Sequence, residues 1–124
     1  MVNYNLAIEL GSSNTVIYMA GIGVVLKEPS LVAMQTINNK KSLLCVGSAA
    51  KNLIGKTNES VDIISPVIES EIVNFNMCKL MLKTFLDKVA PSGLFKKRNK
   101  VVFILPCGIS KIEKKKFIQL AYSL

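Results

Sequence analysis

The sequence predicts an α/β fold in which a mixed sheet is flanked by helices. Three observations lead to this expectation. β-prone runs separated by turn residues fill much of residues 6–64 of the 124-residue chain. An apolar stripe at helical spacing then occupies residues 76–89. Finally, an uninterrupted apolar run at 101–105 precedes a capped helix, as strands of parallel sheets often do. The length suits one compact domain.

The first part of the chain is expected to be mostly strand. The β-prone runs are residues 6–8, 16–19, 24–26, 30–34, 43–46 and 61–64. Pro29 separates the third run from the fourth, and Pro66 ends the last one. A turn signal at 38–41 precedes the fifth run, which can therefore pair back on its predecessor.

Two helices are expected between these strands and the apolar run. A short one spans residues 48–54, with Ser48 as its cap and Gly55 just past its end. The longer helix begins at Asn76. Its apolar stripe, expected to face the core, is Cys78, Met81, Leu82, Phe85, Leu86 and Val89.

The apolar run at 101–105 predicts a strand buried on both faces of a sheet, with parallel pairing. Ser110 and Glu113 then form a capping box that opens a last helix. Its core face is expected to be Phe117, Leu120, Ala121 and Leu124. A strand followed by a helix normally returns to the sheet through another parallel strand. We therefore expect the chain to be a truncated part of a larger α/β domain.

The composition excludes several classes of site. The chain has three cysteines, far apart, and no histidine, which argues against a zinc site and against Ser–His or Cys–His nucleophiles in this chain alone. The thiols of Cys45, Cys78 and Cys107 are expected to be reduced and mostly in the core. No apolar run is long enough to cross a bilayer and no signal sequence is recognisable, so a cytoplasmic location is expected.

The net charge of +8 is unevenly distributed. Residues 1–75 carry five basic and six acidic side chains, whereas residues 76–124 carry eleven basic side chains against Asp87 and Glu113. An anionic partner should therefore meet the second part of the chain. Anionic lipid, nucleic acid and a merely solvated basic surface all fit this distribution, although few aromatics accompany the charges and no nucleic-acid-binding signature is present, so nucleic acid is an unlikely partner.

The turn at residues 11–15 is the strongest candidate for a functional site. Its glycine and hydroxyl residues can bring backbone N–H groups and serine hydroxyls close to a polyphosphate. Glu9, at the end of the preceding strand, can face the hydrated cation that accompanies phosphates. An ordinary hairpin turn has the same residue types, so the turn by itself leaves both interpretations open.

Four segments, in order along the chain, make the phosphate interpretation more specific. Residues 8–15 resemble the phosphate loop written Asp-Leu-Gly-Thr-Ala-Asn-Thr in the MreB/Mbl family of bacterial actin homologues. Residues 23–33 resemble that family's Gly-Ile-Val-Leu-Asn-Glu-Pro-Ser-Val-Val-Ala stretch. Residues 46–57 are similar to a short helix of its inserted subdomain, and residues 104–113 to its Val-Pro-Ser-Gly-Val-Thr-x-Val-Glu strand, turn and helix.

The resemblance implies an actin-like ATPase fold of the ribonuclease H-like type, of which residues 1–124 form the truncated first domain, with a small inserted subdomain at about 33–74. It also implies ATP and Mg²⁺ as cofactors, filaments of homologous actin-like subunits at the cytoplasmic face of the membrane, and cell-wall synthesis machinery as a partner. The cofactor-binding residues that it implies are Gly11, Ser12, Ser13, Asn14 and Thr15. Glu9 would contact the metal through water.

The sequence departs from the family pattern at three places. Ser12 and Ser13 replace the family's Thr and Ala, a mild change, because Ser12 keeps the hydroxyl and the backbone donors remain. Glu9 replaces the family's aspartate and lengthens the arm by one methylene, which affects cation placement. Glu69 and Ser70 replace the family's Asp-Gly, a change expected to alter a turn without touching the nucleotide.

The resemblance also implies what this chain lacks. The glutamate that positions the attacking water, the second phosphate hairpin and the adenosine pocket lie, in the family, beyond residue 124. Phosphoryl transfer needs charge stabilisation from several sides, so this chain alone is expected to bind nucleotide weakly and to have no useful hydrolytic activity.

Residues 93–98 lie where some family members carry a membrane-inserting loop. Leu94 and Phe95 could enter the interface while Lys96, Lys97 and Arg98 attract anionic headgroups. A phenylalanine packed under its own loop beside solvated lysines is an equally good interpretation. As an alternative to an ATP-dependent subunit, the chain could be a nucleotide-independent module that binds a full-length actin-like subunit or the membrane.

Overall fold

The computed structural model describes residues 5–90 and 100–124. Its larger layer is a mixed sheet of four strands in the order β3-β2-β1-β9. These strands are β1 (Asn5–Leu10), β2 (Asn14–Met19), β3 (Gly23–Pro29) and β9 (Lys100–Ile104). β1 pairs antiparallel with β2 and parallel with β9, which confirms the expected mixed sheet and its parallel pairing.

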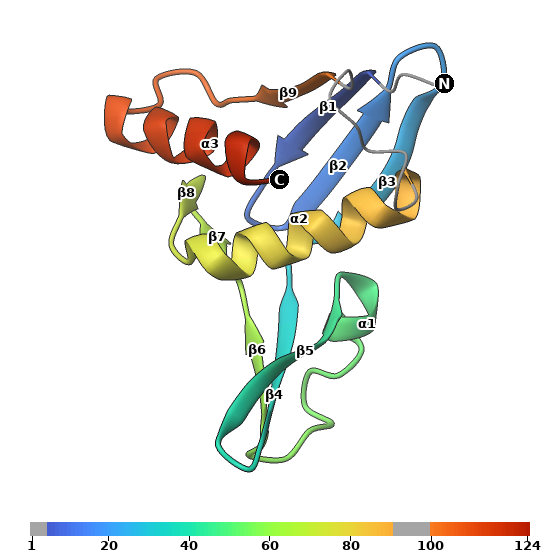
Figure 1. The fold of residues 1–124 in the computed structure, drawn as a ribbon, viewed down its shortest axis with the longest axis vertical. Coiled ribbons are helices and arrows are strands. Elements are labelled where there is room, and N and C mark those ends of the chain that lie inside the picture. Colours follow the sequence, from blue (N-terminus) through green and yellow to red (C-terminus); the bar gives the residue numbers. More distant parts are fainter. Residues whose placement is uncertain (1–4, 91–99) are drawn as a thin grey trace.

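Two helices, α2 (Phe75–Val89) and α3 (Lys111–Ser123), cover one face of this sheet (Figure 1). Strand residues alternate accordingly: Ile8 and Ile17 are fully buried under the helices, whereas Glu9 on the opposite face is exposed. The expected stripe of α2 supplies the centre of the core, with Phe85 completely buried. α2 begins at Asn74, whose side chain accepts a hydrogen bond from the Met77 N–H.

A smaller antiparallel sheet lies at the other end of the molecule (Figure 1). Its order is β5-β4-β6, formed by β4 (Val32–Ile37), β5 (Lys40–Val46) and β6 (Val61–Ile64). β5 pairs back on β4 through a turn in which Asn38 and Asn39 both have positive φ, 52° and 63°. The expected pairing of these two strands is confirmed.

The short helix α1 (Ser48–Lys51) differs from its expected form. It is shorter than residues 48–54, and its N-cap is Gly47, at φ 65°, not Ser48. The Ser48 hydroxyl instead donates to Glu28 Oε2 at 2.7 Å, so it does not cap the helix. The backbone at position 47, with φ 65° and ψ −134°, is one that favours glycine, and a Cβ there would also lie 2.7 Å from Glu28 Oε1.

The expectation that β9 is buried on both faces is wrong. Val102 is 60% exposed and Ile104 is 45% exposed. Between them, Phe103 points to the helical side and meets Phe117 edge to face, with 5.8 Å between ring centroids. β9 is the outer strand of its sheet, and within the described residues no element covers its second face.

The cysteines also correct an expectation. Only Cys78 is buried, whereas Cys45 is half-buried and Cys107 is exposed. All three are free thiols. None of the helices in the described part of the chain is long and apolar enough to cross a bilayer.

Candidate functional site

The β1–β2 hairpin makes its turn at Gly11, Ser12 and Ser13. The Gly11 N–H donates to the Asn14 carbonyl oxygen at 3.0 Å, which closes the loop. A Cβ at position 11 would lie 2.9 Å from that same oxygen, closer than real Cβ contacts. Glycine is therefore required by the close approach of two backbone segments.

The tip of this hairpin presents unused hydrogen-bond donors. Ser12, Ser13 and Asn14 are all exposed. Within residues 5–90 and 100–124, the backbone N–H groups of Ser12 and Ser13 donate to no other backbone group. Adjacent free N–H groups beside serine hydroxyls are a favourable arrangement for an anion such as phosphate.

Thr15 has a different place from its neighbours in the turn. It is fully buried, and its hydroxyl lies 2.8 Å from the Ser30 hydroxyl. The Ser30 N–H also donates to the Ser13 carbonyl oxygen at 2.9 Å. Thr15 and Ser30 thus fix the hairpin to the end of β3, and they hold its exposed donors in one position.

A second hairpin contacts the tip of the first. β7 (Val67–Ile68) and β8 (Glu71–Ile72) form a hairpin with a two-residue turn, which was not predicted from the sequence. Its turn residues, Glu69 and Ser70, both have positive φ, 50° and 66°. The Ser70 N–H donates to the Ser12 hydroxyl oxygen at 3.1 Å, so this turn lies against the candidate phosphate turn.

Glu9 lies beside the turn in a cleft of about 280 Å³. Gly11, Ser70 and Pro106 also line this cleft. Glu9 is exposed, and its one side-chain hydrogen bond to the described residues is a long one from the Tyr18 hydroxyl, 3.4 Å. A lone, solvated carboxylate suits a cation that keeps most of its water, as Mg²⁺ does. Among the described residues, no three acidic, cysteine or histidine side chains cluster to bind a metal directly.

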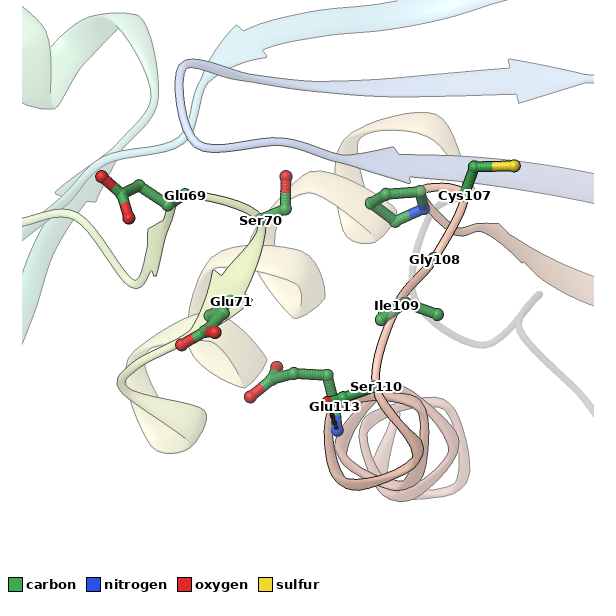
Figure 2. A pocket seen from close by; sticks show the side chains of 9 residues that line it. Glu69, Ser70, Glu71, Cys107, Gly108, Ile109, Ser110 and Glu113 are labelled. Atoms are coloured by element: carbon green, nitrogen blue, oxygen red, sulfur yellow. Dashed lines mark hydrogen bonds between the residues drawn. The ribbon is translucent and has the colours of Figure 1, made fainter.

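A larger cleft of about 380 Å³ adjoins the first, since Ser70 and Pro106 line both. Figure 2 shows Glu69 and Glu71 on the hairpin side of this cleft and the loop Cys107–Ser110 opposite them. The loop connects β9 to α3, so the parallel β1–β9 pairing brings it next to the turn that follows β1.

Glu113 closes the bottom of the larger cleft. It is buried, its Oε1 lies 2.7 Å from Lys116 Nζ, and its Oε2 accepts a hydrogen bond from the Ile72 N–H at 3.2 Å. The hydrogen bond from Lys116 is the main reason why the pKa of the Glu113 carboxyl is lowered, although burial opposes it. Glu113 therefore remains ionised in this position and joins α3 to β8.

The predicted site residues thus fall into two groups. Glu9 and the turn residues Gly11, Ser12, Ser13 and Asn14 lie together at one end of the sheet, and Thr15 supports them from inside. The predicted membrane residues Leu94, Phe95, Lys96, Lys97 and Arg98 lie outside the described residues.

Sequence reasoning missed three contributors to this site: Ser30, Tyr18 and Ser70. Ser30 lies in the 23–33 stretch and Ser70 at the family's Asp-Gly position, but neither motif indicates a contact with the turn. All three residues reach it only through strand pairing or loop packing. A turn is expected at Glu69 and Ser70, but the contact of Ser70 with Ser12 joins residues 58 positions apart in the sequence.

Comparisons with known proteins identify the family and the fold. Residues 3–124 match the sequence model of the MreB/Mbl protein family. The chain is 34% identical over 113 residues to the cell shape-determining protein MreB of Pasteurella multocida, covering 90% of this chain and 32% of that protein. It is 34% identical over 111 residues to the cell shape-determining protein Mbl of Bacillus subtilis, with the same coverage. It therefore spans about a third of the length of these curated relatives.

A crystal structure of MreB5 of Spiroplasma citri bound to AMPPNP has the same fold, with a TM-score of 0.83 and 26% sequence identity. The match covers 99% of this chain and 36% of MreB5. The fold and the hairpin at the end of its sheet define an actin-like domain. The chain belongs to the MreB/Mbl family of cell-shape proteins.

Proposed function

We propose that this chain is the part of an actin-like cell-shape protein that carries the first phosphate-binding hairpin, and that the β1–β2 turn binds the phosphates of ATP. The observation that carries the proposal is the turn itself. Gly11 is required by a 2.9 Å approach. The exposed tip offers two serine hydroxyls and N–H groups that donate to no other backbone group of the described residues. The match to MreB5, whose structure holds AMPPNP, supports the same ligand class.

The residues have separate roles in this proposal. Gly11, Ser12, Ser13 and Asn14 face the phosphates, and Thr15 anchors the turn on Ser30. Glu9 holds Mg²⁺ through water, and the cation would offset phosphate charge. Since one turn contacts phosphate from one side only, this chain alone binds nucleotide weakly and does not hydrolyse it.

Backbone amide NMR tests this proposal, because it detects weak binding and locates it. We expect millimolar MgATP to shift the amide signals of residues 11–15 and of Glu9 in the wild-type chain. Gly11→Ala and Ser13→Ala should weaken the response, because the first displaces the turn and the second removes a hydroxyl. Ser42→Ala, at an exposed strand position far from the turn, is the matched control. Saturable shifts located elsewhere, or a normal response in Gly11→Ala, would contradict the proposal.

We also propose that the chain associates with homologous actin-like subunits into filaments that serve cell shape. Family membership supports this association. The alternative is a nucleotide-independent interaction module, which the exposed apolar side chains Val102 and Ile104 on β9 favour. Co-sedimentation with full-length MreB of Escherichia coli separates the two: pelleting that needs ATP supports the first, and pelleting that ignores ATP supports the second.

We propose, from sequence, that Leu94, Phe95, Lys96, Lys97 and Arg98 bind the cytoplasmic face of the membrane, where cell-wall synthesis machinery would be the family's further partner. The apolar pair can enter the interface while the basic residues attract anionic headgroups. Co-sedimentation with phosphatidylglycerol vesicles tests this. Leu94→Ser with Phe95→Ser should reduce binding, and equal binding of this variant and the wild type would refute the role of the apolar pair.

A further inference from the structure

Tyr18 has a direct contact with Glu9, the carboxylate that faces the cation in the function proposed above. The Tyr18 hydroxyl donates to Glu9 Oε2 over 3.4 Å. In the part of the chain that the structure describes, no other side chain hydrogen-bonds to Glu9, and no lysine or arginine forms an ion pair with it. Among these residues, Tyr18 is therefore the group that orients the Glu9 carboxylate.

The pairing of β1 with β2 brings the two side chains to the same face of the sheet. Glu9 lies opposite Val16 and Tyr18 lies opposite Ala7, so Tyr18 is the diagonal neighbour of Glu9. Diagonal neighbours are about 7–8 Å apart, a distance that a long side chain and an aromatic ring can bridge. Both point away from the face that α2 and α3 cover, where Ile8 is buried. The contact is thus a consequence of the register of the hairpin.

The pairing of β2 with β3 is irregular at Tyr18. Ile17 lies opposite Leu26, whereas Tyr18 lies opposite Val24. Val25 is therefore an extra residue on β3, which makes a β-bulge. Bulges increase the local twist and change the direction of nearby side chains, and they are frequent beside functional sites. Since Tyr18 is also half-buried, its ring has little freedom and the place of its hydroxyl is defined.

We propose that Tyr18 is a positioning residue for the cation that accompanies the bound phosphates, an inference that rests on the proposed function of the β1–β2 turn. Its hydroxyl donates to one oxygen of the Glu9 carboxylate, which leaves the other oxygen for the water shell of Mg²⁺. Glu9 lines the same cleft as Gly11, so this carboxylate lies next to the phosphate turn.

The longer arm of glutamate makes this contact possible. An aspartate at position 9, the residue of the family pattern, would have its carboxylate one methylene closer to the backbone. It would then be drawn away from a hydroxyl that is already 3.4 Å from Glu9 Oε2. Glu9 and Tyr18 therefore act as a pair, and the role of Tyr18 depends on the glutamate.

The effect of Mg²⁺ on ATP binding tests this role. The chain is titrated with ATP while the amide signals of residues 11–13 are followed, first in EDTA and then with Mg²⁺. We expect Mg²⁺ to strengthen binding by the wild-type chain. Tyr18→Phe should reduce this gain about threefold, the effect of one modest hydrogen bond, and should change binding in EDTA far less.

Two further variants separate positioning from a structural role. In a Glu9→Asp background, Tyr18→Phe should not change the gain from Mg²⁺, because the shorter carboxylate does not reach the hydroxyl. If the Tyr18 ring only supported the fold, its loss would weaken binding in both backgrounds and in EDTA as well. Tyr122→Phe removes the same hydroxyl at a position that is 87% exposed on α3, and it should leave the gain unchanged.

The outcomes distinguish this inference from the proposed function. Signals of residues 11–13 that respond to ATP, with no gain from Mg²⁺ in the wild type or with the full gain in Tyr18→Phe, would overturn the role of Tyr18 and keep the phosphate turn. An equal effect of Tyr18→Phe in both backgrounds would also overturn it. No response of these signals in EDTA or with Mg²⁺ would reject the phosphate turn itself, and the inference with it.

Discussion

Glu113 joins α3 to the β7–β8 hairpin through both polar groups of the Ile72 backbone. Its carboxylate accepts from the Ile72 N–H at 3.2 Å, and Lys116, which it holds at 2.7 Å, donates to the Ile72 carbonyl oxygen at 3.2 Å. Because Glu113 is buried, its partners replace water almost completely. One side chain therefore fixes the position of the hairpin that contacts Ser12.

Replacing Glu113 by glutamine should destabilise the chain by about 1–2 kcal/mol at neutral pH, since a hydrogen bond between charged groups is lost. Because the folded-state pKa of Glu113 is lowered, its contribution is complete above the unfolded value of about 4.3. It is lost as the pH falls through the lower folded pKa. Urea unfolding of both proteins between neutral pH and pH values below the folded pKa checks this, and a difference that stays constant with pH would refute the charged role.

The β4–β5 and β7–β8 hairpins have similar turn geometry but different turn residues. Asn38 and Asn39 suit the left-handed conformation of the β4–β5 turn, because asparagine tolerates positive φ. Glu69 and Ser70 have similar positive φ angles in the β7–β8 turn, although glutamate and serine tolerate positive φ less well than asparagine does. The second turn therefore stores backbone strain, and contacts with Ser12 and Glu113 hold it in place.

The double change Glu69→Asn with Ser70→Gly should stabilise the chain by about 1 kcal/mol, because both positions then accept positive φ at lower cost. The Ser70 N–H bond to Ser12 is a backbone bond and is kept. Thermal unfolding measures the gain. Asn39→Gly, in the turn that is already suitable, is the control and should change stability far less; an equal gain in both variants would mean that strain at the second turn is not the cause.

The whole molecule has a continuous core that runs from the four-stranded sheet through α2 and α3 to the start of the small sheet. Cys78 lies in it, completely buried, and burial raises the pKa of its thiol to about 12. Cys107, by contrast, is exposed on the β9–α3 loop. The two thiols therefore report on different parts of the folded state.

In a chain with Cys107→Ser and Cys45→Ser, labelling of Cys78 by a thiol reagent should require global unfolding. We expect its rate to follow the free energy of unfolding as urea is added. At fixed stability, the rate should rise about eightfold from pH 7 to 8, because the reacting thiol is that of the unfolded chain, with a pKa of about 8.5. The matched chain that keeps only Cys107 should label at the rate of an unstructured thiol. Fast labelling of Cys78 in the absence of denaturant would show that α2 opens separately from the sheet.

The local elements were largely predictable. Most strands, the helix expected from Asn76 and the Ser110 cap follow from alternation, from the spacing of apolar residues and from capping rules. The structure begins that helix slightly earlier, at Phe75, and adds the hairpin β7–β8. The α1 cap was not predictable, because Ser48 is drawn to Glu28, which is 20 residues away. Only half of the expected capping box formed, because the Glu113 side chain reaches Ile72 in place of the Ser110 N–H.

Residue types at short spacing were enough to predict the α/β class, the turn at Gly11 and the family to which the chain belongs. The surroundings of the turn come from tertiary contacts: Thr15 is buried on Ser30, Ser70 lies against Ser12, and the β9–α3 loop lies beside Glu9. These contacts join segments distant in sequence. They depend on strand order and packing, which local residue preferences do not encode.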